Sequence, residues 1–350
     1  MKIISIVGAR PQFIKLAPLS EKLSDNHQEI IVHTGQHYDY AMSGAIFSDL
    51  GIRNPDYHLG IGSGSHASQT GEMMKSLEEV MIREEPGLVI IFGDTNSTVA
   101  GALAASKLNI PIVHVEAGLR SYNRSMPEEI NRIVADHVSE YLFAPTESAA
   151  KILQGEGLAD RTIVTGDIMV DTLEKNLPKA LEKYSNPACL DIANLQYTLL
   201  TLHRNYNVDN PRVLIDILKQ LDDLGEPVIF PVHPRTLKIL EGEIFNGKNI
   251  VLTGPLGYMD FIAAEHFSRR IITDSGGVQK EAYILKRPCI TLRTETEWTE
   301  TVTEKWNLLV DPSDKDICEK IISFNPPAAQ QDVFGENVTS KMVEFINRIL

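Results

Sequence analysis

Cysteine is scarce in this sequence, and the few that occur are poorly placed for structural roles. The 350 residues include Cys189, Cys289 and Cys318, which are odd in number and lack the spacing of zinc ligands. A disulfide framework and a metal site are therefore not expected. Chains that leave cysteines unpaired usually work in a reducing compartment, which favours the cytoplasm.

Long apolar runs are also missing. No segment approaches the roughly 18 consecutive apolar residues that a membrane-spanning helix needs. The chain begins with Met1-Lys2 and enters a strand-like segment at once, without the pattern of a signal peptide. We expect a cytoplasmic protein with no membrane insertion.

Positive charge is outnumbered in this chain. Lys and Arg total 33 against 47 Asp and Glu, so the formal net charge is −14 at pH 7. Binding to a nucleic-acid backbone needs a basic surface, and we therefore do not expect a nucleic-acid partner. A small anion can still bind where local donors and cations surround it.

The sequence does contain a repeated alternation of apolar runs and amphipathic segments. Hydrophobic residues make up 43% of the chain and charged residues 23%, as in globular proteins. The alternation predicts an α/β fold with two Rossmann-like doubly wound domains that face each other across a cleft. We place these domains at residues 1–168 and 169–336, with Ser185-Asn186-Pro187 as a candidate hinge.

Two predicted strands in the first domain are followed by acidic residues. The apolar run Leu88–Phe92 is followed by a glycine and Asp94, and the next run, Ile112–Val115, by Glu116. The carboxyl ends of parallel strands border the ligand crevice of such a sheet, so both acids should point at one place. Glu128 opens the next predicted helix and brings a third carboxylate.

These acids can also be interpreted as helix caps. Asp94 and Glu116 could each cap a following helix, because acids near a helix amino end are favoured. Residues Ser125 to Glu128 could form a capping box, with Pro127 early in the helix. Three carboxylates at one place are harder to explain as three independent caps, so we favour a catalytic role. The apolar residues of the helix that Glu128 opens share one face and are Ile130, Ile133, Val134 and Val138.

The first predicted strand, Ile3–Val7, leads into a turn that suits an anion. The turn, Gly8 to Pro11, opens a helix whose amino end offers unpaired backbone N–H groups. Arg10 and Lys15 add positive charge there. The turn lacks the G-x-G-x-x-G pattern of dinucleotide folds, so no nicotinamide cofactor is inferred. The alternative is a structural ion pair for Arg10 and a solvated Lys15.

Histidines follow two predicted strands in the second half. His203 follows the run Tyr197–Leu202, and His233 follows Val228–Val232. A lone histidine is often a satisfied core residue. The matching positions of these two, at the carboxyl ends of strands, favour a shared ligand site equally well.

The segment Asp274 to Tyr283 is the most specific signal in the second half. Gly276 and Gly277 allow close approach of a ligand, and the amino end of the following helix suits a diphosphate beside Ser275. Glu281, further along that helix, could hold ribose hydroxyls. In the alternative, the glycines only shape a tight turn and Glu281 is solvated.

With these residues identified, the chain resembles the non-hydrolysing UDP-N-acetylglucosamine 2-epimerases. Eight separate motifs carry the resemblance along nearly the whole length, and they are GARPQFIK, TGQHYD, GDTNSTVAG, EAGLRS, MPEEINR, HRNYN, HPRT and DSGGVQKEA. The resemblance implies the architecture of the B-type glycosyltransferases, a homodimer, a UDP-sugar substrate and no metal or nicotinamide cofactor. It also implies that a final helix, within residues 337–350, packs back on the first domain.

The same resemblance assigns roles to the residues found above. Asp94, Glu116 and Glu128 are implied to be the essential acids, and His203 is counted with them in the catalytic set. The residues implied to surround the UDP-sugar are Arg10, Lys15, His233, Ser275, Gly276, Gly277 and Glu281. The implied reaction interconverts UDP-N-acetylglucosamine and UDP-N-acetylmannosamine through 2-acetamidoglucal and UDP.

Departures from the family pattern leave the substrate open. The chain has HRNYN at His203 to Asn207, where many members have H-R-R-E-N. In some members the substrate is also an allosteric activator, through residues near the end of the second strand. This chain has GQHYDYAMS there, so activation by substrate is not carried over. The first motif and Thr296-Glu297-Trp298 also resemble 2-epimerases that act on UDP-2,3-diacetamido-glucuronic acid. That epimerase activity is an alternative, and a UDP-sugar glycosyltransferase is a further one.

Overall fold

The computed structural model describes residues 1–36, 40–183, 196–241 and 247–350. Cys189, the candidate hinge at 185–187 and residues 37–39 of the TGQHYD motif lie outside the described residues. The chain divides into two compact units, of which unit 1 comprises Met1–Glu174 and Asp332–Leu350 and unit 2 comprises Lys175–Gln331. The boundaries fall at 174/175 and 331/332, where the sequence alone placed them at 168/169 and 336/337.

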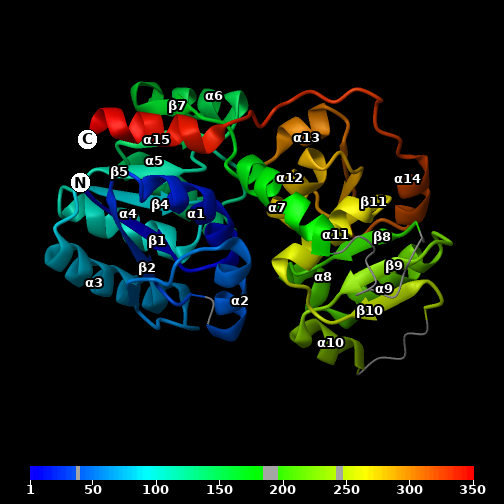
Figure 1. The fold of residues 1–350 in the computed structure, drawn as a ribbon. Helices are drawn as coiled ribbons and strands as arrows, with labels where there is room; N and C mark the ends of the chain where they lie inside the picture. The colour runs from blue at the N-terminus through cyan, green and yellow to red at the C-terminus, as the bar shows by residue number, and fades with distance from the viewer. Residues whose placement is uncertain (37–39, 184–195, 242–246) are drawn as a thin grey trace. The chain divides into compact units, whose positions relative to one another are not determined.

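Unit 1 is built on a sheet of seven parallel strands in the order β3-β2-β1-β4-β5-β6-β7 (Figure 1). The strands are β1 (Lys2–Val7), β2 (Gln28–His33), β3 (Tyr57–His58), β4 (Leu88–Phe92), β5 (Ile112–Val115), β6 (Tyr141–Ala144) and β7 (Thr162–Val164). All of β4 is buried, as is expected of a central parallel strand that helices cover on both faces.

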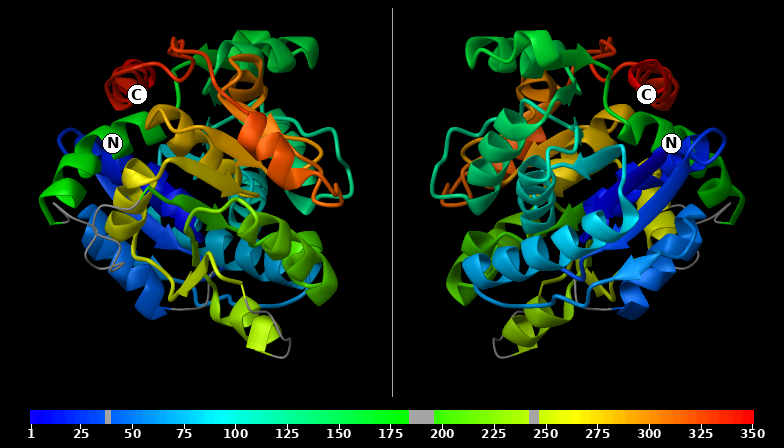
Figure 2. Two further views of the ribbon diagram at one scale, coloured as in Figure 1. Left: turned by 90° about the vertical axis from the view of Figure 1, so that its right-hand side faces the viewer. Right: turned by 90° about the vertical axis from the view of Figure 1, so that its left-hand side faces the viewer.

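Helices lie on both faces of this sheet (Figures 1 and 2). They are α1 (Arg10–Leu23), α2 (Tyr40–Leu50), α3 (His66–Glu84), α4 (Asn96–Lys107), α5 (Pro127–Val138), α6 (Glu147–Gly155), the 3-10 helix η1 (Ala159–Arg161), α7 (Met169–Lys183) and α15 (Val338–Ile349). Helix α7 begins in unit 1 and ends in unit 2.

The last helix of the chain, α15, is part of unit 1. Asp171 of α7 accepts hydrogen bonds from the first two backbone amides of α15, those of Val338 (3.1 Å) and Thr339 (2.7 Å). Phe345 packs edge-on against Tyr141 and Phe143 of β6, with ring centroids 5.4 and 5.5 Å apart. A carboxylate thus holds the amino end of α15, and aromatic contacts hold its second half against the sheet.

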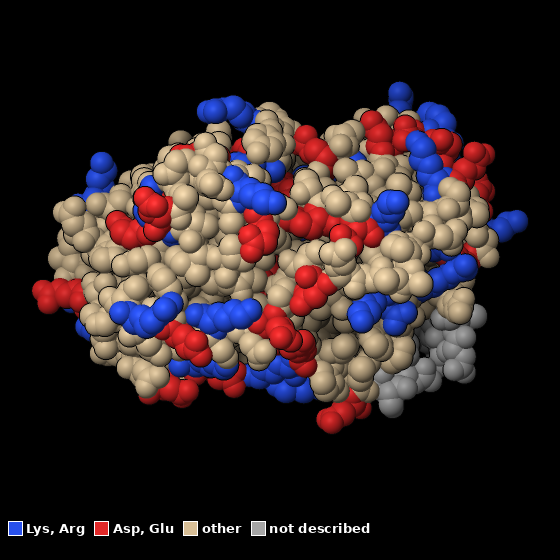
Figure 3. Space-filling model, turned by 90° about the horizontal axis from the view of Figure 1, so that it is seen from above, with Lys and Arg blue, Asp and Glu red and all other residues tan. Residues whose placement is uncertain are grey.

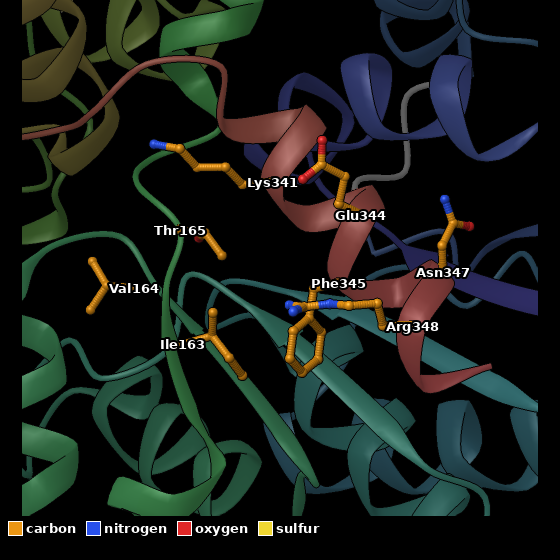
Figure 4. A pocket seen from close by; sticks show the side chains of 8 residues that line it. All are labelled: Ile163, Val164, Thr165, Lys341, Glu344, Phe345, Asn347 and Arg348. Carbon is orange, nitrogen blue, oxygen red and sulfur yellow. The ribbon is translucent and has the colours of Figure 1, made fainter.

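A hollow of about 490 Å³ lies between α15 and the edge strand β7 (Figure 4). The Arg348 guanidinium lies over the Phe345 ring, 5.4 Å from its centroid, on one side of this hollow. None of the residues predicted for the site lines it. We therefore do not place the chemistry there.

Unit 2 repeats the plan with six parallel strands in the order β10-β9-β8-β11-β12-β13. The strands are β8 (Thr198–Thr201), β9 (Val228–Pro231), β10 (Ile250–Thr253), β11 (Arg270–Thr273), β12 (Cys289–Thr291) and β13 (Asn307–Leu309). The helices are α8 (Asn205–Val208), α9 (Pro211–Asp222), α10 (Pro234–Glu241), α11 (Tyr258–Phe267), α12 (Gly276–Ile284), α13 (Thr299–Thr303) and α14 (Ile317–Ser323).

The sheet of unit 2 is buried on both faces. Neighbouring residues of β8 enter different apolar clusters, because successive side chains of a strand point to opposite faces. Leu200 packs in the cluster that contains Leu218 of α9, and Leu199 packs in the cluster that contains Phe261 of α11. Both units are therefore doubly wound, and the predicted fold class of two Rossmann-like α/β domains is confirmed.

Several elements of the structure were not predicted from the sequence. Among them are α2, α10 and the strands β3, β12 and β13. Strand β3 has two residues, and β12 and β13 have three each. Such short strands do not show a period of two.

Two further features concern a nucleic acid or a membrane as a partner, namely the distribution of surface charge and the apolar character of the helices. On the face that Figure 3 shows, acidic and basic side chains of the described residues are interspersed. Across the described ranges, none of the helices combines the length and the apolar character that crossing a bilayer requires.

Candidate active site

The predicted residues lie at the carboxyl ends of strands near the point where each sheet reverses its order. The order in unit 1 runs outward from β1 on one side and β4 on the other, and in unit 2 from β8 and β11. A ligand crevice opens beyond the strand ends at such a point. Asp94 follows β4 and Glu116 follows the neighbouring β5, whereas His203 follows β8 and Ser275 follows β11. The structure thus places Asp94 and Glu116 at neighbouring strand ends in unit 1, and His203 and Ser275 at neighbouring strand ends in unit 2.

Asp94 is held by side chains of helix α5. Its Oδ2 accepts hydrogen bonds from Arg132 Nε (3.0 Å) and Nη2 (2.6 Å), and Asn131 Nδ2 donates to its backbone oxygen (2.9 Å). The cap of α4 is Thr95, whose hydroxyl accepts from the Thr98 amide. The interpretation of Asp94 as a helix cap is therefore wrong.

Glu116 forms an ion pair with Lys15 of α1, and the two side chains are only 10% and 6% exposed. Lys15 is therefore not the solvated lysine of the alternative interpretation. Helix α5 begins eleven residues later, at Pro127, so Glu116 caps no helix. The backbone of Glu116 has φ 74°, in the left-handed region that costs a non-glycine residue about 1–2 kcal/mol. The chain thus accepts strain where this carboxylate is presented.

Gly93 brings the turn that carries Asp94 against this ion pair. Its φ is 60°, a conformation that glycine adopts easily. A Cβ atom at this position would lie 3.1 Å from Glu116 Oε2 and 3.2 Å from Lys15 Nζ. The two acid-bearing turns are therefore in direct contact.

Helix α5 turns its polar face inward, contrary to the usual arrangement. Its buried residues are Glu129, Asn131, Arg132, Ala135 and Asp136. Ile130 is 38% exposed, and Ile133 and Val134 are partly exposed. Of the apolar face recognised in the sequence, Val138 packs against the core of unit 1, whereas Ile130, Ile133 and Val134 are not buried. The reason is that the polar face supplies partners for Asp94 and its neighbours.

Glu128 lies in the first turn of α5. The helix cap is Met126, which makes no side-chain capping bond, and Ser125 Oγ donates to Asn123 Oδ1 instead, so the predicted capping box does not form. Glu128 and Arg132 are four residues apart and so share one side of the helix, the side that contacts Asp94. No hydrogen bond or ion pair of the Glu128 carboxylate is present among the described residues.

The turn after β1 is closed by a glutamine. Gln12 Oε1 accepts from the amides of Gly8 (2.8 Å) and Ala9 (3.0 Å), and its Nε2 donates to the Phe92 oxygen at the end of β4 (2.9 Å). These two amides are therefore used within the fold, and the anion site predicted at this turn would depend on its other groups, such as Arg10. Arg10, the first residue of α1, is partly exposed.

In unit 2, a buried aspartate orients His203. Asp274 Oδ1 lies 2.9 Å from His203 Nδ1, and Asp274 Oδ2 accepts from Asn207 Nδ2 (3.0 Å) and from the Arg204 amide (3.0 Å). Burial alone would raise the pKa of Asp274, but the hydrogen bonds from His203 and Asn207 outweigh it and lower that pKa. The His203 side chain is 55% exposed, so it is a presented group and not a core histidine.

The segment after β11 forms the amino end of α12. Ser275 is the cap position and its hydroxyl makes no capping bond, while Gly276 and Gly277 are the first helical residues. The first amides of a helix have no partner within it and can bind an anion. Glu281 is 4% exposed, so the alternative of a solvated side chain is wrong.

His233 follows β9, next to the strand that precedes His203. It is exposed, and its Nδ1 accepts from the Arg235 amide (3.2 Å). Like His203, it is not a core histidine. No contact joins the two histidines among the hydrogen bonds and ion pairs of the described residues.

The structure adds contacts to these residues that the sequence did not indicate. Arg132 pairs with Asp94, Asp274 orients His203, and Gln12 joins the turn after β1 to β4. Arg132 and Gln12 stand inside the MPEEINR and GARPQFIK motifs. Position within a motif was the only signal for them, because a long side chain gives no indication of its partner.

Comparison with known proteins agrees with the fold and the motifs. The sequence model of the family described as UDP-N-acetylglucosamine 2-epimerase matches residues 21–346. A UDP-N-acetylglucosamine 2-epimerase homolog of Methanococcus maripaludis is 51% identical, with all of both chains covered. The UDP-2,3-diacetamido-2,3-dideoxy-D-glucuronate 2-epimerase of Pseudomonas aeruginosa is 42% identical, again with all of both chains covered.

A solved structure extends the likeness to three dimensions. The Methanocaldococcus jannaschii UDP-GlcNAc 2-epimerase, in complex with UDP-GlcNAc and UDP, matches this chain with a TM-score of 0.93 and 41% identity, covering all of both chains. The architecture is that of the B-type glycosyltransferases, as predicted. The chain belongs to the UDP-N-acetylglucosamine 2-epimerase family.

Proposed function

We propose that this chain is a non-hydrolysing 2-epimerase that interconverts UDP-N-acetylglucosamine and UDP-N-acetylmannosamine. The observation that carries the proposal is the match, over the whole chain, to a UDP-GlcNAc 2-epimerase whose structure holds UDP-GlcNAc and UDP. The grouping of three carboxylates at the ends of β4 and β5 and the start of α5 supports it.

The reaction explains why carboxylates are needed. The C2 hydrogen of the sugar is barely acidic, because no carbonyl is adjacent to C2. Breaking the C1–O bond first gives a cation-like C1, and loss of the C2 proton then gives 2-acetamidoglucal and UDP. Protonation of C2 on the opposite face and return of the UDP oxygen to C1 complete the inversion. None of these steps transfers a hydride, so none calls for a nicotinamide, and we propose that the donors and cations of the protein hold the leaving diphosphate without a metal.

The ion pairs suggest how the acids divide the work. Asp94 faces Arg132 and Glu116 faces Lys15. An opposite charge favours an ionised carboxylate, so these two acids suit proton removal from C2 and stabilisation of the positive charge at C1. Glu128 makes no ion pair within the described chain, and we propose that it completes the set of acids that the two proton transfers at C2 need.

The remaining residues are proposed to hold the nucleotide. A diphosphate is suited to the amino end of α12, and the buried Glu281 is proposed to bind the ribose. Retention of UDP is essential, because its escape from the glucal intermediate would end the reaction before re-addition. The residues proposed to bind the UDP-sugar are Arg10, Lys15, His203, His233, Ser275, Gly276, Gly277 and Glu281.

A second substrate is favoured by one specific observation. The Pseudomonas relative that acts, by its name, on UDP-2,3-diacetamido-2,3-dideoxy-D-glucuronate is 42% identical over the full chain. This is close to the identity with the UDP-GlcNAc enzyme of known structure, 41%. The same elimination and re-addition would apply, with a C3 amide and a C6 carboxylate on the sugar.

Proton NMR in D2O tests both substrates. The purified protein is mixed with UDP-N-acetylglucosamine without added metal or nicotinamide, and we expect UDP-N-acetylmannosamine to appear with deuterium at C2 in both epimers. If only the diacetamido-glucuronate nucleotide reacts, the second substrate is correct. If neither nucleotide changes, the proposed function fails.

We also propose that the protein works as a homodimer. The outward face of α5 carries the apolar residues Ile130, Ile133 and Val134, which the described chain leaves at least partly exposed. A second copy would remove this apolar surface from water, and contiguous exposed apolar surface is typical of an interface.

A further inference from the structure

One histidine of the first unit lies in an unusual position. His114 interrupts the apolar strand β5, and its side chain is fully buried. Its Nδ1 lies 2.7 Å from Asp136 Oδ1 of α5, and its Nε2 lies 2.7 Å from the backbone oxygen of Gly93. The Gly93 oxygen can only accept a hydrogen bond, and so can the Asp136 carboxylate when it is ionised. Hydrogen bonds to both acceptors need a proton on each ring nitrogen, which is the arrangement of an imidazolium cation.

The carboxylate of Asp136 is ionised for reasons that the structure makes plain. Its Oδ2 accepts from Arg120 Nη1 (2.7 Å) and from the Gly118 amide (3.2 Å). Burial alone would raise the pKa of Asp136, but the hydrogen bond and charge of His114 and the charge of Arg120 outweigh it, and that pKa is lowered. Arg120 in turn pairs with Glu156 through Nε (2.9 Å) and Nη2 (2.6 Å). Two cations thus balance two anions in this cluster.

This cluster connects the turns that carry the proposed reacting acids. Gly93, whose oxygen His114 binds, directly precedes Asp94. Gly118, whose amide binds Asp136, stands two residues after Glu116. A single carboxylate of α5 therefore holds one turn through His114 and the other directly.

Asp136 is part of α5, and that helix also carries the third acid and contacts Asp94. The same helix begins with Glu128 and bonds to Asp94 through Asn131 and Arg132. Because Asp136 anchors the helix on both turns, it sets the spacing of all three acids. A hydrophobic residue at position 114 could fill the volume but could not hold the Gly93 oxygen.

We propose that His114, as a buried imidazolium paired with Asp136, is a positioning residue of the epimerase reaction. It touches no substrate and acts through the backbone of Gly93 on Asp94. The inference rests on the proposed function, because the placement of Asp94 matters for turnover only if Asp94 takes part in it.

The first arm of the test compares His114→Gln and Asp136→Asn with wild type. We expect kcat to fall by about 10- to 100-fold, the range for loss of a buried group that orients a reacting one. KM and the affinity for UDP should stay within about threefold, since the residues proposed to bind the diphosphate and the ribose, Ser275 to Gly277 and Glu281, belong to unit 2. His137→Gln is the matched control, because His137 is on the same helix but exposed, with Nδ1 on the Ile133 oxygen and 3.9 Å from Glu156 Oε2 at the outer end of the cluster. Its kcat should be unchanged.

The second arm measures the wild-type ring directly. Nitrogen-15 NMR of protein labelled at histidine should show a proton on both ring nitrogens of His114. The His114 signals are assigned by their absence from the spectrum of His114→Gln. A bare nitrogen would overturn the proposal. A kcat within twofold of wild type for His114→Gln would also overturn it. So would a fall in kcat that comes with a similar fold-loss of UDP affinity and a lower melting temperature.

The two arms also separate this inference from the proposed function. If wild-type protein leaves both candidate nucleotides unchanged, the proposed function fails while the NMR result still decides the charge of the ring. If the wild type reacts and His114→Gln reacts equally well, the proposed function stands and the role of His114 is refuted. Should His114→Gln fail to fold, Asp136→Asn and the wild-type NMR decide.

Discussion

The acids of the site are defined by their partners as much as by their own positions. Asp94 has an arginine, Glu116 has a buried lysine, and both carboxylates stand on turns that are pressed together at Gly93. Position after a strand was enough to single out these two carboxylates, and their part in catalysis stays a prediction. Their partners come from α1 and α5, far away in the chain, and no local pattern encodes such a pairing.

Replacing Asp94 by Asn tests the central carboxylate. The amide keeps the shape but cannot take a proton or attract Arg132 as a charge, so we expect turnover to fall by about 10²- to 10⁴-fold. Affinity for UDP should be unchanged by comparison. Turnover is followed by NMR, and UDP binding by calorimetry.

A suitable control for that experiment is Asp160→Asn, since Asp160 is exposed on η1 and belongs to no proposed site. Near-normal turnover of Asp94→Asn, and of Glu116→Gln beside it, would remove the acid-base assignment while leaving the family membership untouched.

At the scale of elements, α5 shows where pattern reasoning fails. An amphipathic helix normally buries its apolar stripe. Here Arg132 and Asp136 are buried because they find ion pairs, and Ile130 is left outside. The period of the helix was predictable from the sequence, but the choice of the buried face depended on partners contributed by β4 and β5.

Strands that stand out in the sequence as an apolar run of four or five residues were predicted well. Strand β4 and strand β5 have the predicted bounds, Leu88–Phe92 and Ile112–Val115. Helix α10, which starts at Pro234 directly after His233, was missed, because its eight residues offer only about two turns of pattern. The position of the site could therefore be predicted from the strands even though some of the surrounding helices could not.

The attachment of α15 gives a prediction at the same scale. Asp171→Ala removes the acceptor for the Val338 and Thr339 amides, which should cost about 0.5–2 kcal/mol, as does the loss of other helix caps. We expect the melting temperature to fall by about 2–4 °C per kcal/mol lost. Calorimetry or circular dichroism measures this.

The matched variant for Asp171 is Glu174→Ala, which removes an exposed carboxylate from the same helix, α7. Equal melting temperatures for the two variants would show that the carboxylate of Asp171 does not hold α15.

At the scale of the whole molecule, the proposed homodimer can be tested by mass. The chain has a mass of 38.9 kDa, and light scattering should give twice that value for the wild type. The double variant Ile130→Asp, Ile133→Asp places charges on the outward face of α5 and should give the mass of a single chain. Burying an unpaired carboxylate in an interface is strongly unfavourable.

Ile322→Asp serves as the comparison, because Ile322 is 59% exposed on α14 of unit 2. It should leave the mass at twice that of one chain. A wild type with the mass of a single chain, or a double variant that keeps the doubled mass, would contradict the proposed interface.

The return of α15 to unit 1 has a consequence for the order in which a ribosome can finish the two units. Unit 2 is one continuous segment, but unit 1 needs both ends of the chain. Until α15 emerges, Tyr141 and Phe143 lack the Phe345 ring that packs on them, and Asp171 lacks the amides that it binds. Most of unit 1 is therefore translated before unit 2, but unit 1 can be completed only after it. The nascent chain holds an incomplete unit 1 while all of unit 2 is synthesised.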